Sequence, residues 1–300
     1  MVQEFKSIAD TSVFERLQAL AVKPYDLTIS NALTQDERLA RYVSRSPLLN
    51  FHYATQRVDD TVLALLQDLA DELDLVRQFK AMRRGAVLNR IKGYESEERQ
   101  VLHTACRDLF ADAAAEPVAT AATRLELEKL EQFLAEIKAG TLSNSKGRPF
   151  DTMVHVGIGG SDLGPRAMFE SLKAFGQAGR EVRFISNVDP DDAAAVLKTV
   201  NLSTTLVAIV SKSGSTLETL TNEKLVCSAL QEQGLHPKDH CVAVTGQGSP
   251  MDSPENYLRS FYMFDYIGGR FSSTSMVGAV VLGFYLGFDA LTEFLRGASE

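Results

Sequence analysis

Apolar residues follow two different patterns, one before and one after residue 150. In the first half they recur every three or four positions, which is the spacing of amphipathic helices. One such run comprises Val62, Leu65, Leu66, Leu69 and Leu73. Asp59 and Asp60 precede this run and can cap a helix start. Further helices are predicted over about 96–109 and over 127–137, the latter ending at Gly140 in a left-handed conformation.

The second half alternates between short apolar runs and helical segments. The apolar runs are rich in β-branched residues and span 153–158, 182–185, 206–210 and 241–244. Hydrophobicity is continuous within each run, which is typical of buried parallel strands. Helices are predicted between them over 165–175, 191–200 and 217–230. The pattern predicts an α/β fold, an αβα sandwich with a mostly parallel sheet at 151–300, preceded by a mainly helical region at 1–150. The polar segment 140–149 would connect the two.

A glycine-rich loop follows the first predicted strand. Its sequence is GIGGSDLGP over 157–165, and Pro165 is expected at the first position of the next helix. Glycines let a backbone approach an anion closely, and a helix N-terminus carries about half a positive charge, which suits phosphate. A tight turn between strand and helix would explain the same residues.

A second loop carries four hydroxyls and an ammonium within six residues, SKSGST over 211–216. Hydroxyls beside a helix N-terminus can donate to phosphate oxygens. A helix cap at Thr216 would account for one hydroxyl but not for four. The loop therefore favours a phosphate site.

Neither loop matches a common nucleotide-binding motif. A Walker loop needs Lys and then Ser or Thr after its last glycine, but Pro165 and Arg166 follow Gly164. The dinucleotide motif needs a glycine where Asp162 stands. A nicotinamide-dependent enzyme is thus weakly supported.

Arg270 stands between a glycine pair and an uncharged segment in DYIGGRFS, over 265–272. An arginine beside apolar sequence needs an anionic partner. That partner is either a substrate or a carboxylate in a structural salt bridge.

Composition narrows the class of protein. The 300 residues are 45% hydrophobic and 23% charged, with a net charge of −8, which argues against nucleic-acid wrapping. The apolar run 276–288 is too short to span a bilayer as a helix. Three cysteines without CxxC spacing suggest neither a disulfide framework nor a zinc site. Five histidines without metal spacing are interpreted as structural: His52, His103, His155, His236 and His240.

Three motifs resemble the glucose-6-phosphate isomerase family in order and separation. They are VGIGGSDLGP over 156–165, SKSGSTLET over 211–219 and DYIGGRFSSTSMVG over 265–278. The upstream segment SEERQVLHTACR, over 96–107, is also similar. The resemblance implies a sugar-isomerase (SIS) domain at 151–300, a hexose 6-phosphate substrate, and proton transfer between C2 and C1 through a cis-enediolate without metal or nicotinamide.

The resemblance also implies residue roles. Ser161, Ser211, Lys212, Ser213 and Thr216 would bind phosphate, the Gly160 backbone would lie against the sugar, and Arg270 would stabilise the enediolate. Ser213 stands where a threonine is common in the family, and Gly214 where a bulkier residue is common, but the hydroxyl is kept.

The family's base glutamate, its ring-opening histidine and a near-terminal lysine belong to later motifs that do not occur among these residues. The resemblance therefore implies a fragment that lacks the second SIS domain and is inactive on its own. A cytoplasmic homodimer is expected of the full-length enzyme. A non-catalytic SIS module that binds phosphosugars is the alternative, although such a module would not need the Gly-Gly-Arg element.

Overall fold

The computed structural model describes residues 6–28, 31–91, 93–144 and 146–300. The chain divides into two compact units, Met1–Met82 together with Glu300, and Arg83–Ser299. The sequence predicts a boundary between two family domains near residue 150, and that boundary stays a prediction. The described part of the predicted connection, which leaves out residue 145, has no helix or strand between Gly140 and Phe150.

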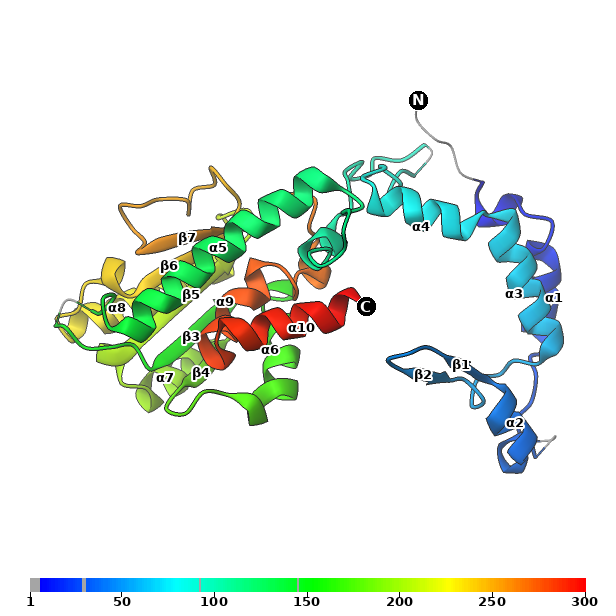
Figure 1. Cartoon of the computed structure of the whole chain (residues 1–300), viewed down its shortest axis with the longest axis horizontal. Coiled ribbons are helices and arrows are strands. Elements are labelled where there is room, and N and C mark those ends of the chain that lie inside the picture. Colours follow the sequence, from blue (N-terminus) through cyan, green and yellow to red (C-terminus); the bar gives the residue numbers. More distant parts are fainter. Residues whose placement is uncertain (1–5, 29–30, 92, 145) are drawn as a thin grey trace. The chain divides into compact units, whose positions relative to one another are not determined.

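The N-terminal unit combines short helices with a two-stranded antiparallel ribbon (Figure 1). Its elements are α1 (Phe14–Val22), α2 (Asp36–Arg41), β1 (Val43–Arg45), β2 (Asn50–His52), α3 (Asp60–Glu72) and α4 (Leu75–Arg83), which ends one residue into the next unit. The predicted helix at 62–73 is confirmed as α3, and the Asp59 carboxylate accepts from the Val62 N–H at 2.9 Å. The buried Arg38 guanidinium donates to the carbonyl oxygens of Ala54 and Val58, each at 2.9 Å, which ties α2 to the chain after the ribbon.

The C-terminal unit is built on a five-stranded parallel sheet in the order β4-β3-β5-β6-β7 (Figure 1). The strands are β3 (Thr152–Gly157), β4 (Glu181–Ile185), β5 (Thr205–Ser211), β6 (Cys241–Thr245) and β7 (Arg259–Tyr262). The helices are α5 (Pro117–Ala139), α6 (Gly160–Leu172), α7 (Pro190–Thr199), α8 (Leu217–Glu232), α9 (Met276–Leu286) and α10 (Phe288–Ser299). This unit also contains the short 3₁₀ helices η3 (His103–Cys106) and η7 (Gly269–Phe271).

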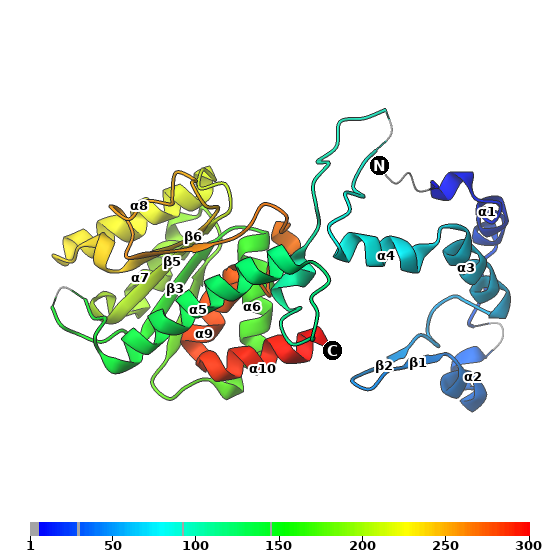
Figure 2. The same ribbon diagram turned by 45° about the horizontal axis from the view of Figure 1, so that its top comes forward.

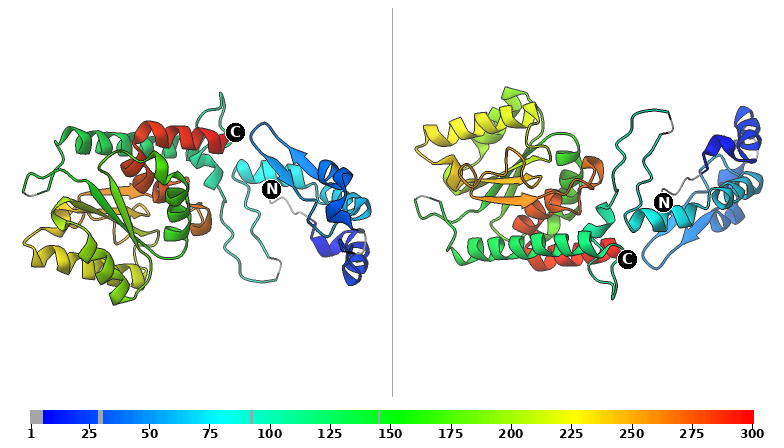
Figure 3. Two further views of the ribbon diagram at one scale, coloured as in Figure 1. Left: turned by 90° about the horizontal axis from the view of Figure 1, so that it is seen from below. Right: turned by 90° about the horizontal axis from the view of Figure 1, so that it is seen from above.

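Helices cover both faces of this sheet, as Figures 2 and 3 show. Strand residues alternate between two apolar clusters, so Val207 and Ile209 face one layer while Leu206 and Ala208 face the other. Helices α7 and α8 contribute to the first of these clusters, and α5, α6, α9 and α10 contribute to the second. The predicted αβα sandwich with a parallel sheet, the fold class expected of a sugar-isomerase (SIS) domain, is confirmed.

The four predicted strands and the predicted helix before Gly140 are confirmed, and Gly140 has a φ of 72°. The predicted helix over 96–109 is wrong. Glu98 has a φ of 43°, which a right-handed helix cannot contain, and only η3 is helical there. The Leu102 N–H instead donates to the Tyr266 carbonyl at 3.0 Å, so this segment is held by a partner distant in the sequence.

The expected start of helix α6 is also wrong. The helix begins at Gly160, and Pro165 lies inside it rather than at its first position. Proline has no N–H to donate to the carbonyl four residues back, which belongs to Ser161. The side chain of His155, on β3, bonds that carbonyl instead, with Nε2 at 2.7 Å from the oxygen.

Candidate active site

The loops identified from the sequence leave the carboxyl ends of neighbouring strands. The chain runs from β3 outward to β4 and then returns to β5 on the other side of β3. Helices α6 and α8, which follow β3 and β5, therefore lie on opposite faces of the sheet. A crevice forms at such a change of direction, and ligands of open α/β sheets bind there. The two predicted phosphate loops flank this point.

The glycine-rich loop packs backbone to backbone against the segment that carries Arg270. A Cβ on Gly160 would lie 2.6 Å from the Gly269 carbonyl oxygen and 2.8 Å from the Arg270 nitrogen. The Ser272 hydroxyl adds a bond to the Gly160 carbonyl at 3.3 Å. The start of α6 and η7 are thus brought together, as predicted for one site, and only glycine fits at position 160.

Arg270 itself is exposed at the surface of this junction. Across the described ranges, its guanidinium makes no hydrogen bond or ion pair with a side chain or the backbone. The structural salt bridge considered as an alternative is therefore not found among these residues. An unpaired guanidinium is suited to bind an anionic ligand, and the backbone of Arg270 lies against the N-terminus of α6.

Asp162 is the one carboxylate of the glycine-rich loop, and it would repel an anion if it were unpaired. It is buried, and Arg166 donates to its Oδ1 through Nε at 3.0 Å and through Nη2 at 2.7 Å. This pair, four residues apart on α6, neutralises the carboxylate. The first turn of α6 therefore keeps its positive character.

The hydroxyl-rich loop joins β5 to α8. The hydroxyls of Ser211 and Thr216 lie 2.9 Å apart, so Thr216 does not use its side chain to cap α8. Helix capping, the alternative explanation for the Thr216 hydroxyl, is therefore not observed at this residue. Ser213 is exposed on the same loop, and its hydroxyl accepts from the Ser215 N–H at 3.2 Å. Gly214 closes the turn at a φ of 64°, a conformation that favours glycine.

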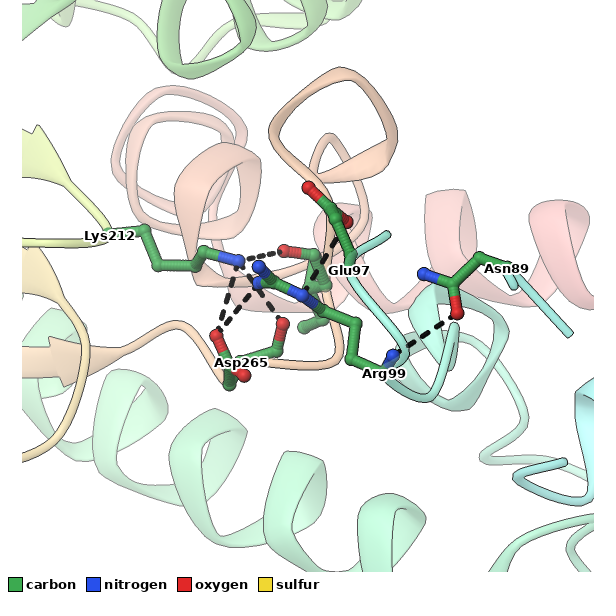
Figure 4. A network of polar contacts seen from close by, with 6 residues as sticks. Asn89, Glu97, Arg99, Lys212 and Asp265 are labelled. Carbon is green, nitrogen blue, oxygen red and sulfur yellow. Dashed lines mark hydrogen bonds and ion pairs between the residues drawn. The ribbon is translucent and has the colours of Figure 1, made fainter. Parts of the chain in front are cut away.

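Lys212 connects the hydroxyl-rich loop to the segment before Arg270. Its ammonium is turned toward Asp265 and Ile267 (Figure 4). The family resemblance implies that Lys212 binds phosphate, and this role stays a prediction. Asp265 and Arg99, which meet in the same network, were not singled out from the sequence, because 166 residues separate them and each is ordinary in a polar turn.

The His155 side chain connects strand β3 to the backbone of Ser161 at the start of α6. His155 is fully buried, and this burial lowers the pKa of its imidazole. The structural role expected of this histidine is confirmed by its bond to the Ser161 carbonyl. The Ser161 side chain remains partly exposed at the start of α6, beside Gly160.

A separate cavity lies away from these loops. It has a volume of about 320 Å³ between α5, α9 and α10, and Leu134, Gly283 and Phe288 are among its lining residues. It contains none of the predicted site residues. In the described part of the chain, no three His, Cys, Asp or Glu residues are grouped so as to hold a metal ion. None of the helices described there is long and apolar enough to cross a membrane.

The family model described as phosphoglucose isomerase matches residues 52–300, which include both phosphate loops and Arg270. The chain belongs to this family. The glucose-6-phosphate isomerase of Desulfotalea psychrophila is 54% identical over all of this chain and 56% of that protein. The Chlamydia muridarum enzyme of the same name is 45% identical over 98% of this chain and 55% of its own length.

A solved structure gives the same result at the level of the fold. The crystal structure of a glucose-6-phosphate isomerase from Chlamydia trachomatis superposes with a TM-score of 0.87 at 44% identity. The superposition covers 98% of this chain and 56% of that structure. The chain therefore spans about half the length of the curated relatives it matches.

Proposed function

We propose that the whole protein is a glucose-6-phosphate isomerase and that these residues form the phosphate-binding part of its active site. The reaction would interconvert glucose 6-phosphate and fructose 6-phosphate through a cis-enediolate. The observation that carries the proposal is the exposed, unpaired Arg270, held by backbone contact against Gly160 at the start of α6. Membership of the phosphoglucose isomerase family supports it.

The phosphate would be held by hydroxyls and by helix N-termini. Ser161 lies in the first turn of α6, Ser211 ends β5, and Ser213 and Thr216 lie in the loop before α8. Each hydroxyl can donate to a phosphate oxygen. Lys212 adds positive charge from the same loop. The Gly160 backbone would lie against the sugar, as the family resemblance implies.

Arg270 would act on the reacting end of the sugar. A cis-enediolate carries negative charge that the ground-state sugar lacks, and a positioned guanidinium stabilises the charge as it develops. The glutamate that moves the proton and the histidine that opens the ring would come from outside these 300 residues, as the family resemblance implies. The proposal extends to a cytoplasmic homodimer of the whole protein.

The experiment is a coupled assay of fructose 6-phosphate conversion by the whole protein, purified from a host without its own isomerase. Arg270→Ala should lower kcat by roughly 10²–10³ and change KM much less, because the guanidinium acts mainly on the transition state. Arg296→Ala removes an exposed arginine of α10, paired with Glu293, and serves as the control that keeps wild-type kinetics. Phosphosugar binding without turnover in the wild-type protein would instead favour the non-catalytic module.

A further inference from the structure

Asp265 lies at the centre of a polar network that joins three segments distant in the sequence (Figure 4). Arg99 Nη1 lies 3.0 Å from Asp265 Oδ1, and Lys212 Nζ lies 3.6 Å from the same oxygen. Arg99 is held in turn by Glu97, whose Oε2 lies 3.5 Å from its Nε, and by Asn89, whose Oδ1 accepts from its backbone N–H at 3.1 Å.

The ammonium of Lys212 is committed to the main chain of the same segment. Its Nζ lies 3.1 Å from the Asp265 carbonyl oxygen and 3.1 Å from the Ile267 carbonyl oxygen. With the contact to Asp265 Oδ1, three oxygens surround a group that has three N–H donors. The ammonium therefore binds the chain three to five residues before Arg270.

This segment has little regular structure of its own. Between the end of β7 at Tyr262 and η7, it is held by contacts with other parts of the unit. The Leu102 N–H donates to the Tyr266 carbonyl, and Tyr266 packs on the small cluster of Leu102, Ala105 and Ala119. The segment ends at Gly269, whose backbone lies against Gly160. The position of Arg270 therefore depends on how the chain at 265–268 is anchored.

The charges of this network contribute little to stability. The Asp265 side chain is 81% exposed, and that of Arg99 is 35% exposed. Ion pairs this open to solvent contribute about 0–1 kcal/mol to folding. The geometry of the network has a larger effect on the reaction rate, because misplacing a reacting group by about 1 Å lowers the rate by roughly 10².

We propose that Asp265 and Arg99 are positioning residues for Arg270, and that the Lys212 ammonium supports them by binding the main chain of the same segment. The inference rests on the proposed function. Arg99 holds the Asp265 carboxylate, Lys212 holds the Asp265 and Ile267 carbonyls, and together they fix the chain that leads into Gly268 and Gly269. The backbone of Arg270 then lies against Gly160, and no residue that the structure describes pairs with its guanidinium.

The test uses the whole protein and measures kcat, KM for fructose 6-phosphate and the melting temperature. Asp265→Ala should lower kcat about 10- to 100-fold, with a KM within a few-fold of wild type and an unchanged melting temperature. Arg99→Ala should do the same, and Arg99→Lys should recover part of the loss because it keeps a cation. Glu170→Ala is the matched control, an exposed carboxylate that is paired with Lys173 and lies near the C-terminal end of α6, away from Gly160.

The deciding measurement is Asp265→Ala in an Arg270→Ala background. If Asp265 acts through Arg270, the double variant should have the kcat of Arg270→Ala alone. A further multiplicative loss in the double variant, or a single variant with wild-type kcat, would overturn the positioning role. Absence of isomerase turnover in the wild-type protein would overturn the proposed function itself, so the two failures are distinguishable. Circular dichroism of each variant excludes loss of the fold as the cause of a rate change.

Discussion

His155 Nε2 lies 2.7 Å from the carbonyl oxygen of Ser161, six residues later in the chain. A carbonyl can only accept, so Nε2 carries a proton and donates it in this bond. Among the described residues Nδ1 has no hydrogen-bond partner, as expected for a ring enclosed in the sheet. This side chain supplies the hydrogen bond that Pro165 cannot make, so α6 can begin at Gly160 despite an internal proline.

His155→Leu should destabilise the protein by roughly 1 to 3 kcal/mol, because it leaves the Ser161 carbonyl without its side-chain donor. The free energy of unfolding, measured in urea, checks this value. His236→Leu is the matched control, since His236 is exposed and its replacement should change stability little. Equal effects of the two substitutions would mean that the bond to Ser161 contributes nothing.

The protein should lose stability as the pH falls below about 6.5, the ordinary value for histidine. Burial lowers the pKa of His103, His155 and His240. The unfolded chain therefore binds these protons more readily than the folded chain, and protonation favours unfolding. Melting temperatures between pH 8 and pH 5 measure the effect. In His155→Leu the decline should be shallower, and an unchanged slope would contradict the assignment to this residue.

Gly160→Ala should abolish isomerase activity, because the new methyl group would push against the Gly269–Arg270 peptide. The loop and η7 cannot both keep their places, so Arg270 moves away from the crevice. Gly268→Ala is the matched control, since a Cβ there meets nothing within 4 Å and the φ of −74° suits alanine. Steady-state kinetics of the two variants would reveal the difference, and an active Gly160→Ala enzyme would rule out this close packing.

Thr216→Ala should weaken glucose 6-phosphate binding by roughly 1 to 3 kcal/mol, the usual loss for a hydrogen bond to a charged group. Titration calorimetry with the whole protein measures it, with unphosphorylated glucose as the weak-binding reference. Thr221→Ala provides the same substitution further along α8, where the hydroxyl already bonds the Leu217 carbonyl at 2.8 Å. Identical affinities for the two variants would remove Thr216 from the phosphate site.

A chain that begins at residue 151 should fold poorly, whereas a chain that begins at residue 83 should fold. Leu130, Phe133 and Ile137 of α5 are buried in the same cluster as the sheet residues, and Phe133 meets Phe261 of β7 edge-on at 5.4 Å. Phe133→Ala should cost about 3 to 5 kcal/mol for the same reason. Urea unfolding of the two truncated chains and of this variant provides the comparison. A cooperative, stable 151–300 chain would support the boundary predicted from the sequence.

The sheet could be predicted largely because its three central strands, β3, β5 and β6, are buried on both faces. Continuous apolar runs such as Leu206–Val210 leave few alternatives. β7 was missed because its sequence, RSFY, mixes polar and apolar residues, as an edge strand does. The short strands β1 and β2 show no clearer hydrophobic pattern than β7, since their six residues are half-buried or exposed.

The loops of the proposed site could be selected from the sequence for a different reason. Glycine and hydroxyl residues are concentrated in loops directly after strands, so Gly160, Ser161, Ser211 and Thr216 could be selected from the sequence. The direction of the Lys212 ammonium could not, because it depends on oxygens of Asp265 and Ile267 that only the fold brings near. The hydrogen bond of His155 could not be predicted either. Its partner is the Ser161 carbonyl, which Pro165 cannot bond because proline has no N–H.

Helices α6 and α8 begin at the same crevice but are packed into different apolar layers, one on each face of the sheet. A phosphosugar that contacts both N-termini would therefore be bound only while both layers are folded. Binding to the native state raises the free energy of every opening that disrupts the site. Amide hydrogen exchange should accordingly slow in α6 and in α8 together when ligand is added, although the two helices share no apolar cluster of described residues.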